Sequence, residues 1–90
     1  MISAAQRETV SSFSAQPERA LDTLGKMWVL RMHWWWETTR GDHAAANDSA
    51  RQLDVVRKRF RRQTDPLVPI DKIEKEWDHW FRVWFKKLRR

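Results

Sequence analysis

Residues 17–39, PERALDTLGKMWVLRMHWWWETT, decide the fold because their pattern is that of one long amphipathic helix. Pro17 suits the first turn of such a helix, and Gly41 is suited to terminate it. The apolar arc in the second half of this segment is too wide for a single neighbour, so we expect the helix to pack against two or more others. Apolar side chains recur along it at intervals of three and four residues: Leu21, Leu24, Trp28, Met32 and Trp35.

A second tryptophan cluster lies near the C-terminal end of the chain and has the same spacing. A step of seven residues, such as Trp28 to Trp35, returns a side chain to nearly the same helix face. Because indole rings bury large apolar areas, we expect the two clusters to meet in a helical core. The members expected in that core are Trp28, Trp35, Trp77 and Trp84.

The rest of the chain also favours helix, with two glycines and three prolines among 90 residues. A third helix can begin near Asp42 or His43, or later at Ser49, which has capping-box spacing to Gln52. Short connections make successive helices antiparallel. The sequence therefore predicts a single all-α domain, a three-helix bundle with an additional N-terminal helix or arm. Its expected segments are 1–15 for the helix or arm, and 17–39, 43–63 and 70–90 for the main helices.

The net charge of +6 is unevenly distributed. Residues 1–50 carry five Lys or Arg and six Asp or Glu, whereas residues 51–90 carry thirteen and six, a net of +7. Such asymmetry indicates an acidic partner for the C-terminal part, either nucleic acid, anionic lipid or an acidic protein surface. The alternative is that these cations only keep an aromatic-rich helix in solution.

A run of cations near residue 60 is the strongest candidate for contact with nucleic acid or an acidic protein. The cations fan around the helix axis, an arrangement that can contact phosphates where a helix end enters a groove. Exposed tryptophans would add stacking on unpaired bases. The candidate residues are Arg57, Lys58, Arg59, Arg61 and Arg62, together with Lys86 and Arg89 in the last helix.

Three consecutive tryptophans, Trp34, Trp35 and Trp36, cannot all face one core, since neighbours on a helix diverge by 100°. We expect Trp36, and next Trp34, to reach a partner surface, because tryptophan is enriched at interface hot spots. Arg31 falls inside the same apolar arc. Its guanidinium is expected to stack on an indole ring, or else to pair with a partner molecule.

Several classes of function find no support in the sequence. The lack of cysteine excludes disulfides, thiolate zinc sites and cysteine nucleophiles, and it fits the cytoplasm, where thiols stay reduced. Glu76 and His79 have the spacing of a di-iron ligand pair, but a second such pair is missing. No serine or threonine has a recognisable base and orienting acid. We expect no catalytic residue, metal ion, cofactor or small-molecule substrate, and no secretory signal.

The sequence therefore predicts a small, non-enzymatic interaction or regulatory protein. Its partner would be another protein or a second copy of itself, so we expect a homodimer or a subunit of a complex. The first alternative is a nucleic-acid-binding protein that uses the run from Arg57 to Arg62. A weaker alternative is a peripheral membrane protein that uses its basic and aromatic last helix.

Overall fold

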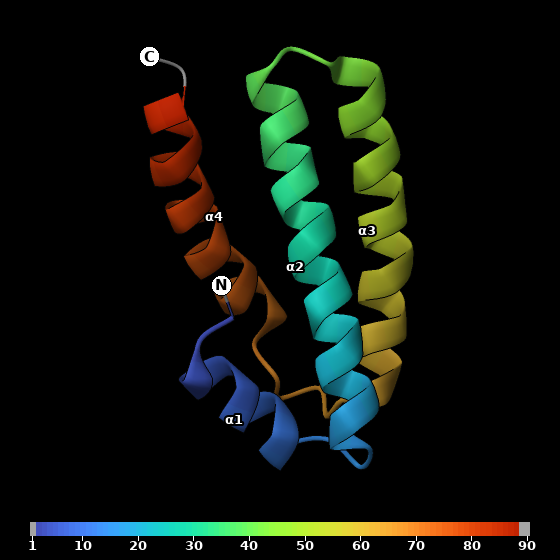
Figure 1. Ribbon diagram of the computed structural model, residues 1–90. Helices are drawn as coiled ribbons and strands as arrows, with labels where there is room; N and C mark the ends of the chain where they lie inside the picture. The colour runs from blue at the N-terminus through green and yellow to red at the C-terminus, as the bar shows by residue number, and fades with distance from the viewer. Residues whose placement is uncertain (1, 89–90) are drawn as a thin grey trace.

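The computed structural model describes residues 2–88, which form four α-helices and no strand (Figure 1). The all-α class that the sequence predicts is confirmed for these residues. No helix among them has the length and apolar character needed to cross a membrane. The helices are α1 (Ala4–Ser12), α2 (Pro17–Thr39), α3 (His43–Gln63) and α4 (Ile70–Leu88).

The ends of the first three helices follow from local chemistry. Ser3 and Gln6 form a capping box at the start of α1, each side chain accepting a hydrogen bond from the backbone N–H of the other. Pro17 occupies the first turn of α2. Gly41, with φ of +77°, makes the turn after α2 in a conformation that other residues adopt at a cost.

Asp42 sets the start of α3 by accepting a hydrogen bond from the backbone N–H of Ala45 at 3.2 Å. The alternative start at Ser49 is therefore wrong. The hydroxyl of Ser49 instead donates to Glu37 of α2 at 2.5 Å, which ties the two helices together near their shared turn.

Helices α2 and α3 form an antiparallel pair, and α4 lies beside α2 (Figure 1). The short helix α1 lies across the end of the molecule where α2 and α4 begin (Figure 1). Its Gln6 accepts a hydrogen bond from the indole N–H of Trp77 at 2.9 Å and donates one to Glu76 at 2.6 Å. Helix α1 thus contacts α4 at Glu76 and Trp77.

A single hydrophobic core receives side chains from all four helices and from the α3–α4 connection. Trp77 is buried at its centre, with 1% of its surface exposed. The aromatic faces of α2 and α4 meet through pairs of Trp and Phe, with ring centroids 5.3 Å apart for Trp28–Phe81 and 5.7 Å for Trp36–Phe85. The largest fully buried side chains are Trp77, Phe60, Phe81, Leu24, Met27, Val10 and Val68.

The tryptophans do not divide between core and surface as their spacing predicts. Trp28 and Trp35 are half-buried against the core, but Trp84 is exposed, so its expected place in the core is wrong. Trp80, which lies on the same side of α4, is 51% exposed. The hydrogen bonds between α1 and α4 are at Glu76 and Trp77, whereas the rings of Trp80 and Trp84, farther along α4, lie 6.4 Å from each other.

Candidate macromolecule-binding surface

Arg31, predicted to contact a partner, forms ion pairs within the chain. Its Nε and Nη2 atoms donate to the two carboxylate oxygens of Asp78, each at 2.7 Å, and its Nη1 lies 3.4 Å from Glu74. The guanidinium carbon also lies 5.4 Å from the ring centre of Trp34, so the expected stacking is present. The indole N–H of Trp35 completes the site by donating to Asp78 at 2.8 Å.

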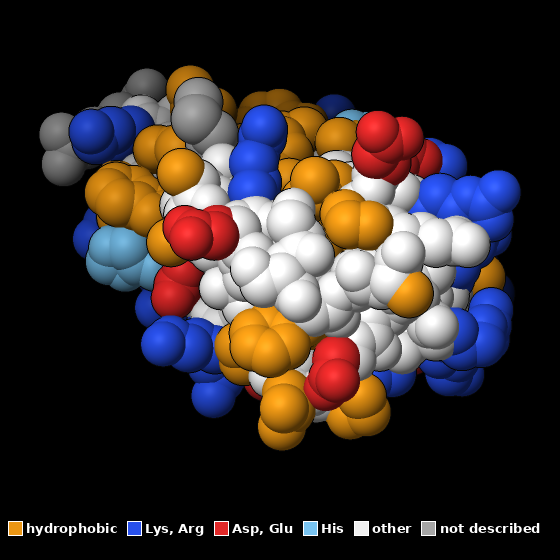
Figure 2. Space-filling model, turned by 90° about the horizontal axis from the view of Figure 1, so that it is seen from below, with side chains coloured by type: hydrophobic (Ala, Val, Ile, Leu, Met, Phe, Trp, Pro, Cys, Tyr) orange, Lys and Arg blue, Asp and Glu red, His pale blue; other side chains and the backbone are white. Residues whose placement is uncertain are grey.

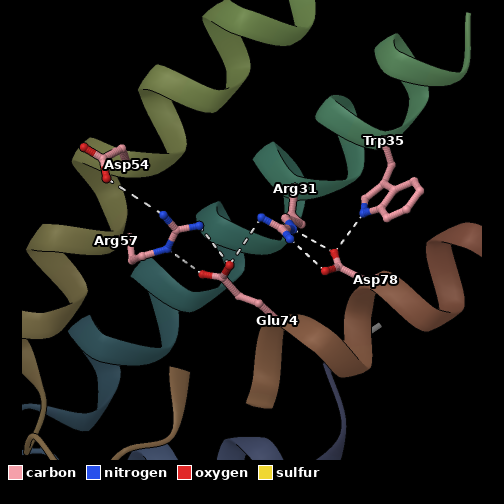
Figure 3. Close-up of polar contacts among 6 residues, drawn as sticks. All are labelled: Arg31, Trp35, Asp54, Arg57, Glu74 and Asp78. Carbon is pink, nitrogen blue, oxygen red and sulfur yellow. Dashed lines mark hydrogen bonds and ion pairs between the residues drawn. The ribbon is translucent and has the colours of Figure 1, made fainter. Parts of the chain in front are cut away.

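Arg57 of α3 likewise forms paired hydrogen bonds with a carboxylate of α4. Its Nε and Nη2 atoms donate to Glu74 at 2.7 and 2.8 Å, and its Nη1 lies 3.8 Å from Asp54. Glu74 therefore sits between two guanidinium groups, with 8% of its side chain exposed. Figure 3 shows the resulting chain of alternating charges, which joins α3, α4 and α2.

The protonation states of this charged network are set by its hydrogen bonds. Burial of Asp78 acts to raise the pKa of its carboxyl group, but the hydrogen bonds from Arg31 and Trp35 outweigh burial and hold that pKa below its ordinary value. The hydrogen bond to Asp78 raises the pKa of Arg31 against the opposing effect of burial. The hydrogen bond to Glu74 likewise raises the pKa of Arg57. Arg31, Arg57 and Asp78 are therefore charged near neutral pH.

The network has a structural role that competes with partner binding. Removing either arginine from its carboxylates would leave buried charge unpaired, which costs several kcal/mol. A partner that recruited Arg31 or Arg57 would have to offset that cost. Their role in binding stays a prediction, and the remaining cations are better placed for it.

The other predicted cations are exposed but lie in different surroundings. Lys58 pairs with Asp54 at 3.0 Å, and Arg61 donates to the backbone carbonyls of Pro66 and Val68 at 3.3 and 3.2 Å. Within residues 2–88 no ion pair is recorded for three further candidates, and Arg89 lies outside the described residues. These three are Arg59, Arg62 and Lys86.

The two predicted tryptophan anchors differ in exposure. Trp36 is exposed, although its ring packs on Phe85 and the guanidinium of Arg40 stacks on it at 5.4 Å. Trp34 is half-buried and makes an edge contact with Trp35 at 5.4 Å. Trp36 is therefore the more accessible of the two.

A groove along the first half of α4 instead combines aromatic and basic side chains. We call it the α4 groove; its volume is about 900 Å³. Trp80 and Leu67, the latter 75% exposed, supply apolar surface, while Arg61 comes from α3 and Lys72 and Lys75 from α4. Its full lining is Arg61, Pro66, Leu67, Val68, Pro69, Ile70, Asp71, Lys72, Lys75, Glu76, His79 and Trp80.

An exposed apolar stripe continues from this groove toward the C-terminal end of α4. Trp80, Trp84 and Leu88 follow one another at intervals of four residues, and the rings of Trp80 and Trp84 lie 6.4 Å apart. Lys86 and Lys87 are exposed beside them. We call these three apolar residues the α4 stripe. The sequence favours a core position for Trp84, because the spacing of these residues equally suits a core helix, and it offers the last helix as a surface only in the weaker membrane-binding alternative.

Figure 2 views the end of the molecule that carries α1 and the α3–α4 connection, and this end shows no single basic face. In this view Lys and Arg side chains lie around the periphery, with acidic and apolar groups between them (Figure 2). Among residues 2–88 no three His, Asp or Glu side chains gather as a metal site would require.

Comparison with protein-family models, with curated proteins and with solved structures gives no match for this chain. The inference of function therefore rests on the geometry and charge of its own residues.

Proposed function

We propose that this protein is a non-enzymatic interaction protein, which binds a segment of another protein in the α4 groove and along the α4 stripe. The observation that carries the proposal is the half-exposed indole of Trp80 in a groove that Leu67, Arg61, Lys72 and Lys75 also line. Exposed apolar side chains that form a contiguous group mark interaction sites, and tryptophan contributes strongly to binding energy there.

Charge favours a partner that presents both carboxylates and apolar side chains. The groove has three Lys or Arg against Asp71 and Glu76, and the stripe adds Lys86 and Lys87. Glu76 accepts a hydrogen bond from the amide of Gln6, which occupies one of its carboxylate oxygens. The surplus is therefore positive but modest, so electrostatics would speed association and select the partner more than it would supply affinity.

Nucleic acid is the second candidate, and the exposed end of α3 favours it. Arg59 and Arg62 are exposed there, and Trp80 offers a ring face on which an unpaired base can stack. Engaging four to six phosphates of a single strand would give a log–log salt slope of about −3 to −4. Because the α4 groove has only a small excess of positive charge, peptide binding there should depend much less on salt concentration.

Binding of two labelled probes, followed by fluorescence anisotropy, tests the proposal. The probes are a helical peptide of leucine and glutamate and a single-stranded oligothymidylate. We expect the peptide to bind, and Trp80→Ala or Lys75→Glu to weaken it by about tenfold, which corresponds to about 1.4 kcal/mol. Val55→Ala, on the exposed face of α3 and outside the groove, is the control and should bind as the wild type does.

Two results would overturn this assignment. Peptide affinity that is unchanged by both α4 substitutions would remove the α4 groove as the site. Tight oligothymidylate binding with a slope of about −3 to −4, lost in Arg59→Glu and Arg62→Glu while these variants still bind the peptide, would favour nucleic acid.

We also propose how the helices are grouped and where the protein is located in the cell. The proposal treats α2, α3 and α4 as a three-helix bundle with α1 as an additional helix. It places the protein in the cytoplasm, which the absence of cysteine supports.

A further inference from the structure

Gly25 lies in the middle of the 23-residue helix α2, where the fold gives no reason for a glycine. A Cβ atom built at this position would meet nothing within 4 Å, and the backbone is not in the left-handed region. Glycine weakens a helix interior relative to alanine. Contacts within the chain therefore do not account for this residue, whereas close approach of a second backbone would.

Gly25 belongs to a groove on the α2–α3 face, which we call the α2 groove. Its volume is about 690 Å³, and Val29 beside the glycine is 40% exposed. It has no lining residue in common with the α4 groove. The lining comprises Leu21, Asp22, Gly25, Lys26, Val29, Leu30, Gln52 and Val56.

The apolar surface extends along α2 beyond the groove. At 100° per residue, the positions from Leu21 to Met32 on this side fall within a sector of about 80°. Helix α3 contacts α2 through Ser49 and Glu37, whereas α4 contacts it through Phe81 and Phe85, which pack on Trp28 and Trp36. The residues of the sector are Leu21, Gly25, Val29 and Met32, of which Val29 is exposed.

The charges of the α2 groove favour a second copy of the chain over an acidic partner. The lining has one acid and one base, so it is neutral in a protein of net charge +6. Asp22 and Lys26 are four residues apart, exposed and 3.3 Å from each other. A two-fold axis perpendicular to α2 between them would place Asp22 of each copy against Lys26 of the other. Self-complementarity of this kind is what a two-fold dimer interface requires.

We propose that the α2 groove is a homodimer interface, in which α2 of a second copy packs antiparallel and the two helix backbones approach most closely near Gly25. The missing side chain lets the helices come together where Asp22 of each copy lies against Lys26 of the other. This inference does not rest on the proposed function, because the α4 groove and the α4 stripe stay accessible in such a dimer.

Sedimentation equilibrium of purified protein over a range of concentrations tests the interface. We expect the wild type to dimerise, Gly25→Leu to raise the dissociation constant by about tenfold or more, and Gly25→Ala to weaken the dimer less. Under dilute, monomeric conditions Gly25→Ala should raise Tm by about 2–6 °C, because alanine favours helix. Ala44→Leu, at an exposed position of α3 outside the groove, is the matched control and should dimerise normally.

Charge reversal tests the antiparallel arrangement. Asp22→Lys alone and Lys26→Asp alone should each weaken the dimer, since like charges then meet across the two-fold axis. Mixing the two single variants should restore association, because the opposite charges meet again between unlike chains. The pair within one chain is absent from both variants, so restoration by mixing reports contact between chains.

The inference is overturned by a wild type that stays monomeric at millimolar concentration. It is equally overturned if Gly25→Leu dimerises with unchanged affinity, or if mixing the charge variants restores nothing. None of these outcomes affects the peptide-binding experiment on the α4 groove, so the two proposals fail separately.

Discussion

Arg31 and Asp78 form two parallel hydrogen bonds of 2.7 Å although 47 positions separate them in the sequence. Paired bonds of this kind fix the orientation of both side chains, and charge-assisted bonds are stronger than neutral ones. Glu74 extends the contact to Arg57, so three helices are joined by charged groups at the edge of the core.

Substitution of Arg31 and of Asp78 should show that the two residues stabilise the fold as a coupled pair. We expect Arg31→Met to lower the free energy of unfolding by about 3 kcal/mol, because Asp78 and Glu74 lose a cation while remaining largely buried. Asp78→Leu should cost a similar amount. The double variant should cost clearly less than the sum of the two, and a double-mutant cycle from urea denaturation measures the difference. Additive losses would show that the pair is not coupled.

Acid should destabilise the protein partly through Asp78. The pKa of this carboxyl is lower in the folded state than its ordinary value of about 3.9, so the unfolded chain binds the proton more readily. The stabilisation is complete above the ordinary range and is lost as pH falls through about 4 toward the lowered pKa. Asp78→Asn should flatten this part of a plot of unfolding free energy against pH. The prediction is contradicted if the unfolding free energy of wild type and variant falls equally steeply below about pH 4.

Truncation of Trp77 and of Trp80, both in α4, should change the stability by very different amounts. Trp77→Ala removes a buried ring and its hydrogen bond to Gln6, so we expect a loss of about 3–5 kcal/mol in unfolding free energy. Trp80→Ala should change it by about 1 kcal/mol or less, because half of that side chain already faces solvent. Thermal unfolding followed by circular dichroism checks both. A large loss for Trp80→Ala would mean that the α4 groove is closed in solution.

Gln6 should control the attachment of α1. Gln6→Ala leaves the buried indole N–H of Trp77 without its acceptor, which we expect to cost about 1–3 kcal/mol. Amide hydrogen exchange across Ala4–Ser12 should become faster than in the wild type. Glu8→Ala, exposed on the same helix, is the control and should leave the exchange of these amides nearly unchanged.

The helical class could be predicted because it depends on local signals. Pro17 at the first turn of α2, and Gly41 with Asp42 between α2 and α3, act through their own backbone geometry and nearest neighbours. Periodicity likewise identifies the apolar faces without knowledge of what covers them.

The candidate site could not be predicted because it depends on contacts between distant segments. Whether Trp84 is buried could not be predicted, because the step of seven residues from Trp77 is the same whether or not another element covers both rings. Arg31 could be identified as needing a partner, but Asp78 could not be chosen among twelve acidic residues. Leu67 lies between two prolines, where no helical pattern reports its surroundings.

The position of Glu74 and Asp78 has a consequence for the aromatic residues farther along α4. If this helix rolled about its axis to hide Trp84, both carboxylates would move away from the guanidinium groups that hold them. Hydrophobic collapse of the indoles is thus opposed by the loss of ion pairs elsewhere on the same helix. An incoming ligand would meet rings already held in place, so it would lose little entropy in ordering them.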